Sequence, residues 1–182
     1  HISLKDLEHL EPWYVKLNSE GVVPTLDHDG KILTESNFII EYLDEVFPDN
    51  PLRPSDHYER WKMRNWMHRF EAVLHKNINT ISFVKQNRIK RYEAFSEEEL
   101  LNFLSHQVNA ERRASYEKRI RNGVSAAEMV FAEDRIAEVV DEMNIALEGK
   151  SFLNGDRVSL ADISVAPFIE RLEANALNQL TD

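Results

Sequence analysis

The residues with the clearest chemical meaning lie in the stretch GVVPTLDHDGKILTESNFIIEY, residues 21–42. Glu35 and Ser36 stand at the expected start of a helix. The first backbone amides of a helix have no partner within the helix and attract a carboxylate, to which the Ser36 hydroxyl can donate. The Glu35 carboxylate can hold an ammonium group. Together these groups suit a peptide-like ligand that carries both charges.

Pro24 follows two valines where the first strand of this stretch is expected to begin. Proline cannot donate to a β-ladder, so it suits the first residue of a strand. We predict a cis Val23–Pro24 bond, which would turn the carbonyl and amide of Val23 toward a ligand. In the alternative, Val23–Pro24 is only a strand boundary and Ser36 or Thr34 is only a helix N-cap.

A β-hairpin followed by a helix must position these groups. Asp29-Gly30 between two apolar runs is the strongest short-range hairpin signal, and it joins strands expected near residues 22–26 and 31–33. A helix expected over residues 35–47 carries one apolar stripe with the 3.6-residue period. The stripe consists of Phe38, Ile39, Tyr42, Leu43 and Val46.

Three prolines between residues 48 and 54 end this helix and stiffen the chain that follows. We therefore divide the chain into a domain of residues 1–47, a linker of residues 48–54 and an all-helical domain of residues 55–182. In the last of these, one helix is expected from Ser55-Asp56 to about Lys85. A second helix is expected from a capping box at Ser96 to about Arg121, and SLAD at residues 159–162 forms a further capping box.

Composition limits the classes of function. The formal net charge of −10 over 182 residues disfavours nucleic acid and anionic membranes as partners. The chain has no cysteine, so it has no disulfide framework and no thiol nucleophile of its own. Apolar runs of only a few residues exclude a transmembrane helix, and with no visible signal peptide we expect a cytoplasmic protein.

The order VVPTL, hairpin and TES, together with the later SLAD, resembles the glutathione S-transferase family over nearly the whole chain. The resemblance implies a thioredoxin-like α/β N-terminal domain, here partial, followed by an all-α C-terminal domain. It implies glutathione as co-substrate. In this family the residue before the cis-proline pairs through its backbone with the cysteinyl part of glutathione, and a Glu-Ser pair binds the γ-glutamyl group. The corresponding residues here are Val23, Pro24, Glu35 and Ser36.

One family contact is missing from this sequence. Many members carry Gln or Lys where Val22 stands, and that side chain reaches the glycine carboxylate of glutathione. Because Val22 cannot make this contact, we expect Lys16 or Asn18 to replace it.

The resemblance also implies that the first helix after the linker lines the cleft for the electrophilic substrate. We expect Asn65, His68 and Arg69 to face it, with a solvated or dimer-facing stripe as the alternative. A metal site at His68, Glu71 and His75, which share a helix face, would need further ligands from elsewhere. No HExxH spacing occurs, so we expect no metal.

As a whole, the resemblance implies a detoxifying enzyme that lowers the thiol pKa of glutathione and lets the thiolate attack a hydrophobic, aromatic electrophile. The reaction would be conjugation or glutathione-dependent ether cleavage, because residues 52–66 and 118–123 resemble bacterial transferases that include the lignin β-etherases. The alternative is a non-catalytic interaction module, which Val22 favours. A thiol-disulfide oxidoreductase is disfavoured by the absence of cysteine.

Family members begin with a strand, a helix and a second strand, and they end with further helices. We therefore expect the chain to be truncated at both ends, with His1–Leu4 as the tail of the second strand and the catalytic hydroxyl or thiol upstream of His1. Aromatic residues at Tyr58, Trp61 and Trp66 predict a homodimer, because an exposed apolar patch is a liability on a monomer and two-fold symmetry is the default.

Overall fold

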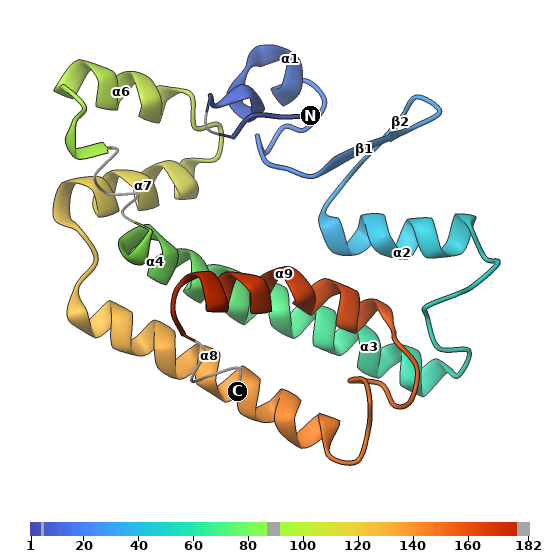
Figure 1. The fold of residues 1–182 in the computed structure, drawn as a ribbon. Helices are drawn as coiled ribbons and strands as arrows, with labels where there is room; N and C mark the ends of the chain where they lie inside the picture. The colour runs from blue at the N-terminus through green and yellow to red at the C-terminus, as the bar shows by residue number, and fades with distance from the viewer. Residues whose placement is uncertain (5, 87–91, 178–182) are drawn as a thin grey trace. The chain divides into compact units, whose positions relative to one another are not determined.

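The computed structural model describes residues 1–4, 6–86 and 92–177, which divide into two compact units (Figure 1). The first unit holds residues 1–39 and 89–123, and the second unit holds residues 40–88 and 124–182. The chain therefore visits each unit twice. The domain boundary predicted at residues 48–54 rests on the prolines there, whereas the two units are defined by contacts between residues. That boundary therefore stays a prediction.

The first unit opens with two short helical turns and a hairpin. A 3₁₀-helix, Glu8–Leu10, precedes helix α1, Pro12–Val15. Strands β1, Thr25–His28, and β2, Lys31–Thr34, then pair antiparallel. The predicted hairpin is confirmed. Both turn residues have positive φ, 54° at Asp29 and 78° at Gly30, as the two-residue turns that match strand twist require.

The prediction that His1–Leu4 is the tail of a strand is wrong, because these described residues form no strand. This segment folds back on the 3₁₀-helix instead. The Ser3 amide donates to the Glu8 carboxylate at 2.7 Å, and the Glu8 amide donates to the Ser3 carbonyl at 3.1 Å. These local bonds use backbone groups that a sheet would need.

The remainder of the first unit consists of α6, Glu97–Ser105, and α7, Ala110–Asn122. The prediction of one helix from Ser96 to about Arg121 is therefore wrong, although its capping box at Ser96 is confirmed. The helix breaks because the Gln107 carbonyl accepts two hydrogen bonds from the Arg113 guanidinium, at 2.8 and 3.1 Å. Asn109 then caps α7 by accepting from the Arg112 amide at 2.9 Å.

Helix α2, Ser36–Val46, begins in the first unit and ends in the second. Near its end the buried Asp44 holds the proline-rich linker. Its carboxylate accepts from the Leu52 amide at 2.6 Å and from the Arg53 guanidinium at 2.6 Å. The Arg53 guanidinium also donates to the Asp44 carbonyl at 2.5 Å. This partly buried ion pair holds the linker against the end of α2 within the second unit.

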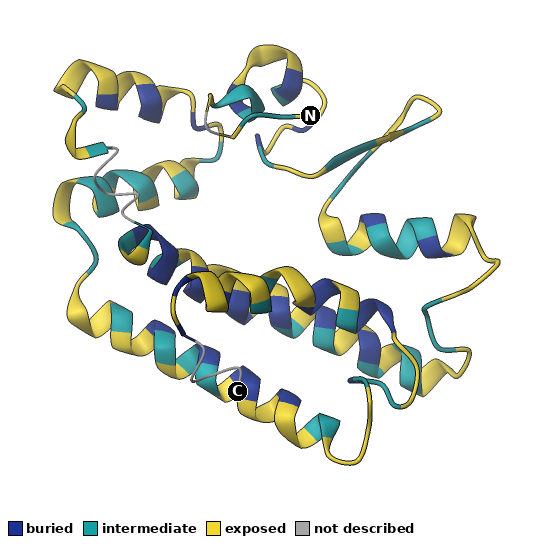
Figure 2. Ribbon diagram, in the orientation of Figure 1, coloured by how far each residue is buried: buried dark blue, intermediate teal, exposed yellow. Residues whose placement is uncertain are grey.

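The second unit is built of helices around one apolar core (Figure 2). Its elements are α3, His57–Arg69, a π-helix at Phe70–His75, α4, Lys76–Lys85, α8, Ala126–Leu147, and α9, Leu160–Ala174. The predicted helix to Lys85 is present, but a π-helical segment interrupts it. Side chains in the core with no exposed surface include Met63, Phe70, Leu74, Ile81, Ile136 and Leu172.

The SLAD capping box at the start of α9 is confirmed. The Ser159 hydroxyl accepts from the Ala161 amide at 3.3 Å, and the Asp162 carboxylate accepts from the Ser159 amide at 2.8 Å. Asp162 also accepts from the Leu153 amide at 3.0 Å, so the box ties the preceding turn to the helix. Among the described helices, each is too short or too polar to cross a bilayer.

Candidate functional site

The hairpin brings the predicted ligand-binding residues together at one of its ends. Thr25 pairs with Thr34 in the antiparallel register. Residues that immediately precede Thr25 and residues that immediately follow Thr34 therefore leave the sheet at the same end. Val23-Pro24 and Glu35-Ser36 occupy these positions, so groups twelve residues apart in the sequence converge.

Val23 presents its backbone to solvent at this end. The Val23–Pro24 peptide is cis, which confirms the prediction. Within the described part of the chain, no hydrogen bond reaches the amide or the carbonyl of Val23. The residue is 40% exposed. Its two backbone groups are thus available to an extended peptide-like ligand.

Glu35 has an unusual backbone conformation. Its φ is 68°, in the left-handed region that residues other than glycine seldom occupy. The Glu35 carbonyl accepts from the Ile39 amide at 2.9 Å, so Glu35 itself is the N-cap residue of α2. The alternative that Ser36 or Thr34 is the N-cap is therefore wrong. A strained backbone that exposes a carboxylate is typical of functional sites.

Ser36 is the first residue of α2, and both its side chain and that of Glu35 are exposed. Neither side chain hydrogen-bonds to another described residue. The Ser36 amide belongs to the first turn, where helix amides have no intrahelical acceptor. An ammonium group can meet the Glu35 carboxylate here, while a carboxylate meets the hydroxyl and amide of Ser36.

Two buried side chains hold the loop before β1. Tyr14 Oη donates to the Val22 carbonyl at 2.7 Å, and Asn18 Nδ2 donates to the same oxygen at 2.8 Å. Thr25 Oγ1 lies 2.8 Å from Tyr14 Oη and accepts from Asn18 Nδ2 at 3.2 Å. We call this set the Tyr14–Asn18 clamp. The sequence pattern assigned Tyr14 no role, although tyrosine and asparagine one helical turn apart just before a strand are a usable signal.

The clamp decides between the two residues proposed to replace the missing Val22 contact. Asn18 is 3% exposed, and its amide nitrogen already donates to Val22 and Thr25. A ligand carboxylate therefore cannot use Asn18, and that expectation is wrong. Lys16 is the C-cap residue of α1 and lies between the two clamp residues in the sequence; it is exposed, so its ammonium stays available.

The three predicted substrate contacts lie on α3 in the second unit and differ in their surroundings. Asn65 and His68 are exposed. Arg69 forms a bidentate ion pair with Glu142 of α8, at 2.9 and 2.6 Å. Because its donors are already used between two helices, Arg69 is the weakest of the three as a substrate contact.

The face considered for a metal holds a local pair instead. His75 Nδ1 lies 2.7 Å from Glu71 Oε1, and this hydrogen bond lowers the pKa of Glu71. Glu71 and His75 themselves lie in the π-helix at Phe70–His75, which follows His68, so the expected α-helical spacing does not hold. In the described ranges, no three His, Cys, Asp or Glu side chains form a group that could hold a metal ion.

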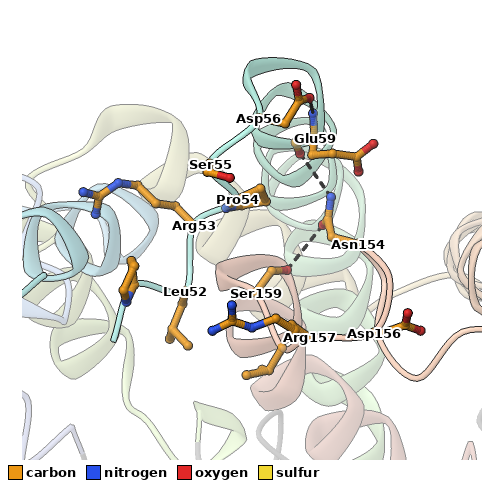
Figure 3. Close-up of a pocket in the computed structure, with 12 residues that line it drawn as sticks. Leu52, Arg53, Pro54, Ser55, Asp56, Glu59, Asn154, Asp156, Arg157 and Ser159 are labelled. Carbon is orange, nitrogen blue, oxygen red and sulfur yellow. Dashed lines mark hydrogen bonds between the residues drawn. The ribbon is translucent and has the colours of Figure 1, made fainter. Parts of the chain in front are cut away.

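A pocket of about 450 Å³ lies in the second unit between the linker and the turn before α9 (Figure 3). The Asn154 side chain crosses it by donating to the Glu59 carbonyl at 3.1 Å and accepting from Ser159 Oγ at 3.3 Å. Asp56 caps α3 at its upper edge. These polar groups join chain segments, and the sequence had indicated no site here.

The aromatic residues Tyr58, Trp61 and Trp66 of α3 take part in two stacked pairs, one of which includes Phe70 of the π-helix. Trp66 and Phe70 stack at 5.5 Å, with Phe70 fully buried in the core. Tyr58 and Trp61 stack at the same separation but are 64% and 57% exposed. The first pair is structural, and the second leaves a flat aromatic surface on the second unit.

Two family models match the chain. A model of the glutathione S-transferase N-terminal domain matches residues 1–51, and a model of the glutathione S-transferase C-terminal domain matches residues 89–179. Protein LigF of Sphingobium sp. strain SYK-6 is 34% identical over 159 residues, which cover 86% of this chain and 61% of LigF. Glutathione S-transferase 1 of Dianthus caryophyllus is 30% identical over 163 residues, covering 89% of this chain and 59% of that protein.

Solved structures give the same result. The crystal structure of β-etherase LigF from the same Sphingobium strain has a TM-score of 0.83 at 29% identity, covering 94% of this chain and 71% of that one. Maleyl pyruvate isomerase, a bacterial glutathione S-transferase of the Zeta class, has a TM-score of 0.67 at 22% identity, with 96% and 70% covered, and shows the fold alone. The chain spans about three-fifths of the length of the two curated relatives.

The backbone at Glu35 predicts an unusual order of stability. The free energy of unfolding of Glu35→Gly should be about 0.5–1 kcal/mol higher than that of Glu35→Ala. The reason is that glycine relieves the left-handed strain by more than its extra chain entropy costs. Urea unfolding of both variants measures this difference. At Ser36, which has no positive φ, the order should reverse, with Ser36→Gly below Ser36→Ala. Equal stability of the two Glu35 variants would show that the conformation carries no strain.

Proposed function

The chain belongs to the glutathione S-transferase family, and from this premise we propose that it binds glutathione at the hairpin end formed by Val23, Pro24, Glu35 and Ser36. The observation that carries the proposal is the Thr25–Thr34 register, which places the unpaired backbone of Val23 beside the exposed Glu35 and Ser36. The Val23 backbone pairs with the cysteinyl group. The Glu35 carboxylate holds the γ-glutamyl ammonium, and Ser36 holds the γ-glutamyl carboxylate.

The family assignment also confirms the predicted fold class. A thioredoxin-like part with a small antiparallel sheet precedes the all-helical glutathione S-transferase C-terminal domain. Likeness to the β-etherase branch is confirmed by the match to LigF. Fold alone does not select a substrate, so substrate and reaction rest on the site.

We propose Lys16 as the partner of the glycine carboxylate of glutathione. Val22 is apolar, and its carbonyl already accepts two hydrogen bonds from the clamp. Lys16 lies on the same short segment as Tyr14 and Asn18, which fix that segment against the loop. An ammonium on a flexible stem can reach a carboxylate without defined geometry.

The proposed reaction is attack of the glutathione thiolate on a hydrophobic, aromatic electrophile, by conjugation or by ether cleavage. The thiolate is the nucleophile, so the enzyme must hold the thiol deprotonated. The exposed face of α3 at Asn65 and His68 is the proposed contact for the second substrate, and Arg69 joins it only if its pair with Glu142 opens. The likeness to β-etherase LigF supports an aryl ether as one such substrate.

A non-catalytic interaction module remains the second candidate function. The apolar side chain of Val22 favours it, because the usual side-chain contact to the glycine carboxylate is absent. The exposed Glu35 and Ser36 favour glutathione binding. The two functions differ in the first measurement below, since an interaction module needs no glutathione.

Replacing Glu35 and Ser36 together by alanine should weaken glutathione binding at least about tenfold, because two charge-assisted contacts are lost. Calorimetry on the full-length protein measures the dissociation constant. Glu45→Ala is the matched control, since Glu45 is an exposed carboxylate near the other end of α2. Equal affinity of wild type and double variant would exclude this site, and no binding by wild type would favour the interaction module.

Full-length enzyme with glutathione should turn over aryl ethers or aryl halides faster than small aliphatic halides, because an aromatic ring of the substrate can stack on His68 at the proposed second site. His68→Ala should raise KM for the aromatic substrate several-fold and leave KM for glutathione unchanged. His57→Ala is the control, as another exposed histidine on α3. Turnover of aliphatic halides alone, unaffected by His68→Ala, would overturn the substrate assignment but not the family.

We propose a homodimer that covers the exposed Tyr58–Trp61 pair, in a cytoplasmic protein. Trp61→Ala should shift sedimentation of the full-length protein from dimer toward monomer at micromolar concentration, because the flat aromatic surface is lost. Trp13→Ala, which removes an exposed tryptophan from the first unit, should leave the dimer intact. A wild-type monomer at this concentration would contradict the proposal.

A further inference from the structure

We propose that Tyr14 and Asn18 are positioning residues for glutathione, which act by aiming the amide of Val23 at the ligand. The inference rests on the proposed glutathione site and adds two residues to it. Neither side chain needs to touch glutathione. Their role follows from the one oxygen atom that they share, the carbonyl oxygen of Val22.

The Val22 carbonyl is held from the protein side by two donors. Tyr14 Oη lies 2.7 Å and Asn18 Nδ2 lies 2.8 Å from it. A carbonyl oxygen has two lone pairs, so these donors use its full capacity. Both side chains are 3% exposed, and water therefore competes little for the bonds. The carbonyl has one direction available, into the protein.

A peptide bond transmits this direction to the next residue. The Val22 carbonyl and the Val23 amide belong to one planar unit, and this unit is trans because the cis bond is the following one. In a trans unit the C=O and N–H bonds point in opposite directions. When the carbonyl is fixed inward, the Val23 amide must point outward, where no described residue accepts from it.

The clamp also holds the chain on the far side of Pro24. Asn18 Nδ2 donates to Thr25 Oγ1 at 3.2 Å, and the Thr25 hydroxyl can donate to Tyr14 Oη at 2.8 Å. Thr25 opens β1 opposite Thr34, which directly precedes Glu35. The same two side chains thereby link the orientation of the Val23 amide to the strand pair that directly precedes Glu35.

A purely structural role is the competing explanation, since buried hydrogen bonds also stabilise a fold. Loss of the Tyr14 hydroxyl would then lower stability without a specific effect on glutathione. Tyr116→Phe provides the matched control. Tyr116 is a half-buried tyrosine of the same unit whose ring packs edge-on against Phe103 at 5.4 Å.

The experiment compares wild type, Tyr14→Phe, Thr25→Val and Tyr116→Phe as full-length proteins. Glutathione dissociation constants come from calorimetry, thermal stability from melting curves, and the ¹⁵N chemical shift of the Val23 amide from NMR of the free protein. That shift responds to hydrogen bonding at the Val22 carbonyl, because both atoms belong to the same conjugated unit.

We expect Tyr14→Phe to move the Val23 amide shift and to raise the dissociation constant about threefold to tenfold, while Tyr116→Phe changes neither. Thr25→Val should act in the same direction. Unchanged affinity in Tyr14→Phe, with wild type still binding, would overturn the positioning role alone. Absence of glutathione binding by wild type would overturn the proposed function, and an unmoved Val23 shift would overturn the clamp itself.

Discussion

The hydrogen bonds that converge on the Val22 carbonyl are the constraint on which the site depends. Through them, and through their contacts with Thr25, the buried side chains of Tyr14 and Asn18 hold the chain on both sides of Pro24. With them, the loop enters the hairpin in a fixed conformation, and the hairpin register brings Glu35 to the same end. Helix α2 then starts at this point, so its first amides are directed at the ligand space. Each step fixes the geometry of the next.

The second unit depends on a comparable polar contact inside an apolar environment. Asp44 is buried, and its carboxylate is satisfied by the Leu52 amide and the Arg53 guanidinium. A buried carboxylate is costly unless its oxygens are hydrogen-bonded, which explains why the linker backbone supplies a donor as well. The linker is therefore a defined structural segment and not a flexible tether. The capping box at Ser159 has the same effect on the turn that precedes α9.

Local signals explain what the sequence predicted correctly. Asp29-Gly30 specified the hairpin because both residues tolerate positive φ, and Ser96 and Ser159 specified helix starts through bonds three residues away. The missed features depend on side-chain contacts. Arg69 pairs with Glu142, which is 73 residues away, and the break at Gln107 depends on a side chain that reaches back to a backbone carbonyl. No periodicity in a short window reports such contacts.

The left-handed backbone at Glu35 also bears on how this chain can change by mutation. A single base change converts either glutamate codon into a glycine codon, and glycine is the residue best suited to a φ of 68°. The most accessible replacement that eases the backbone is thus one that removes the carboxylate. At this position, the mutation that relieves backbone strain also removes the negative charge, so fold stability and ligand binding favour different residues. If the proposed function is correct, the ammonium group that Glu35 binds is the reason for a glutamate at a position that glycine would fit better.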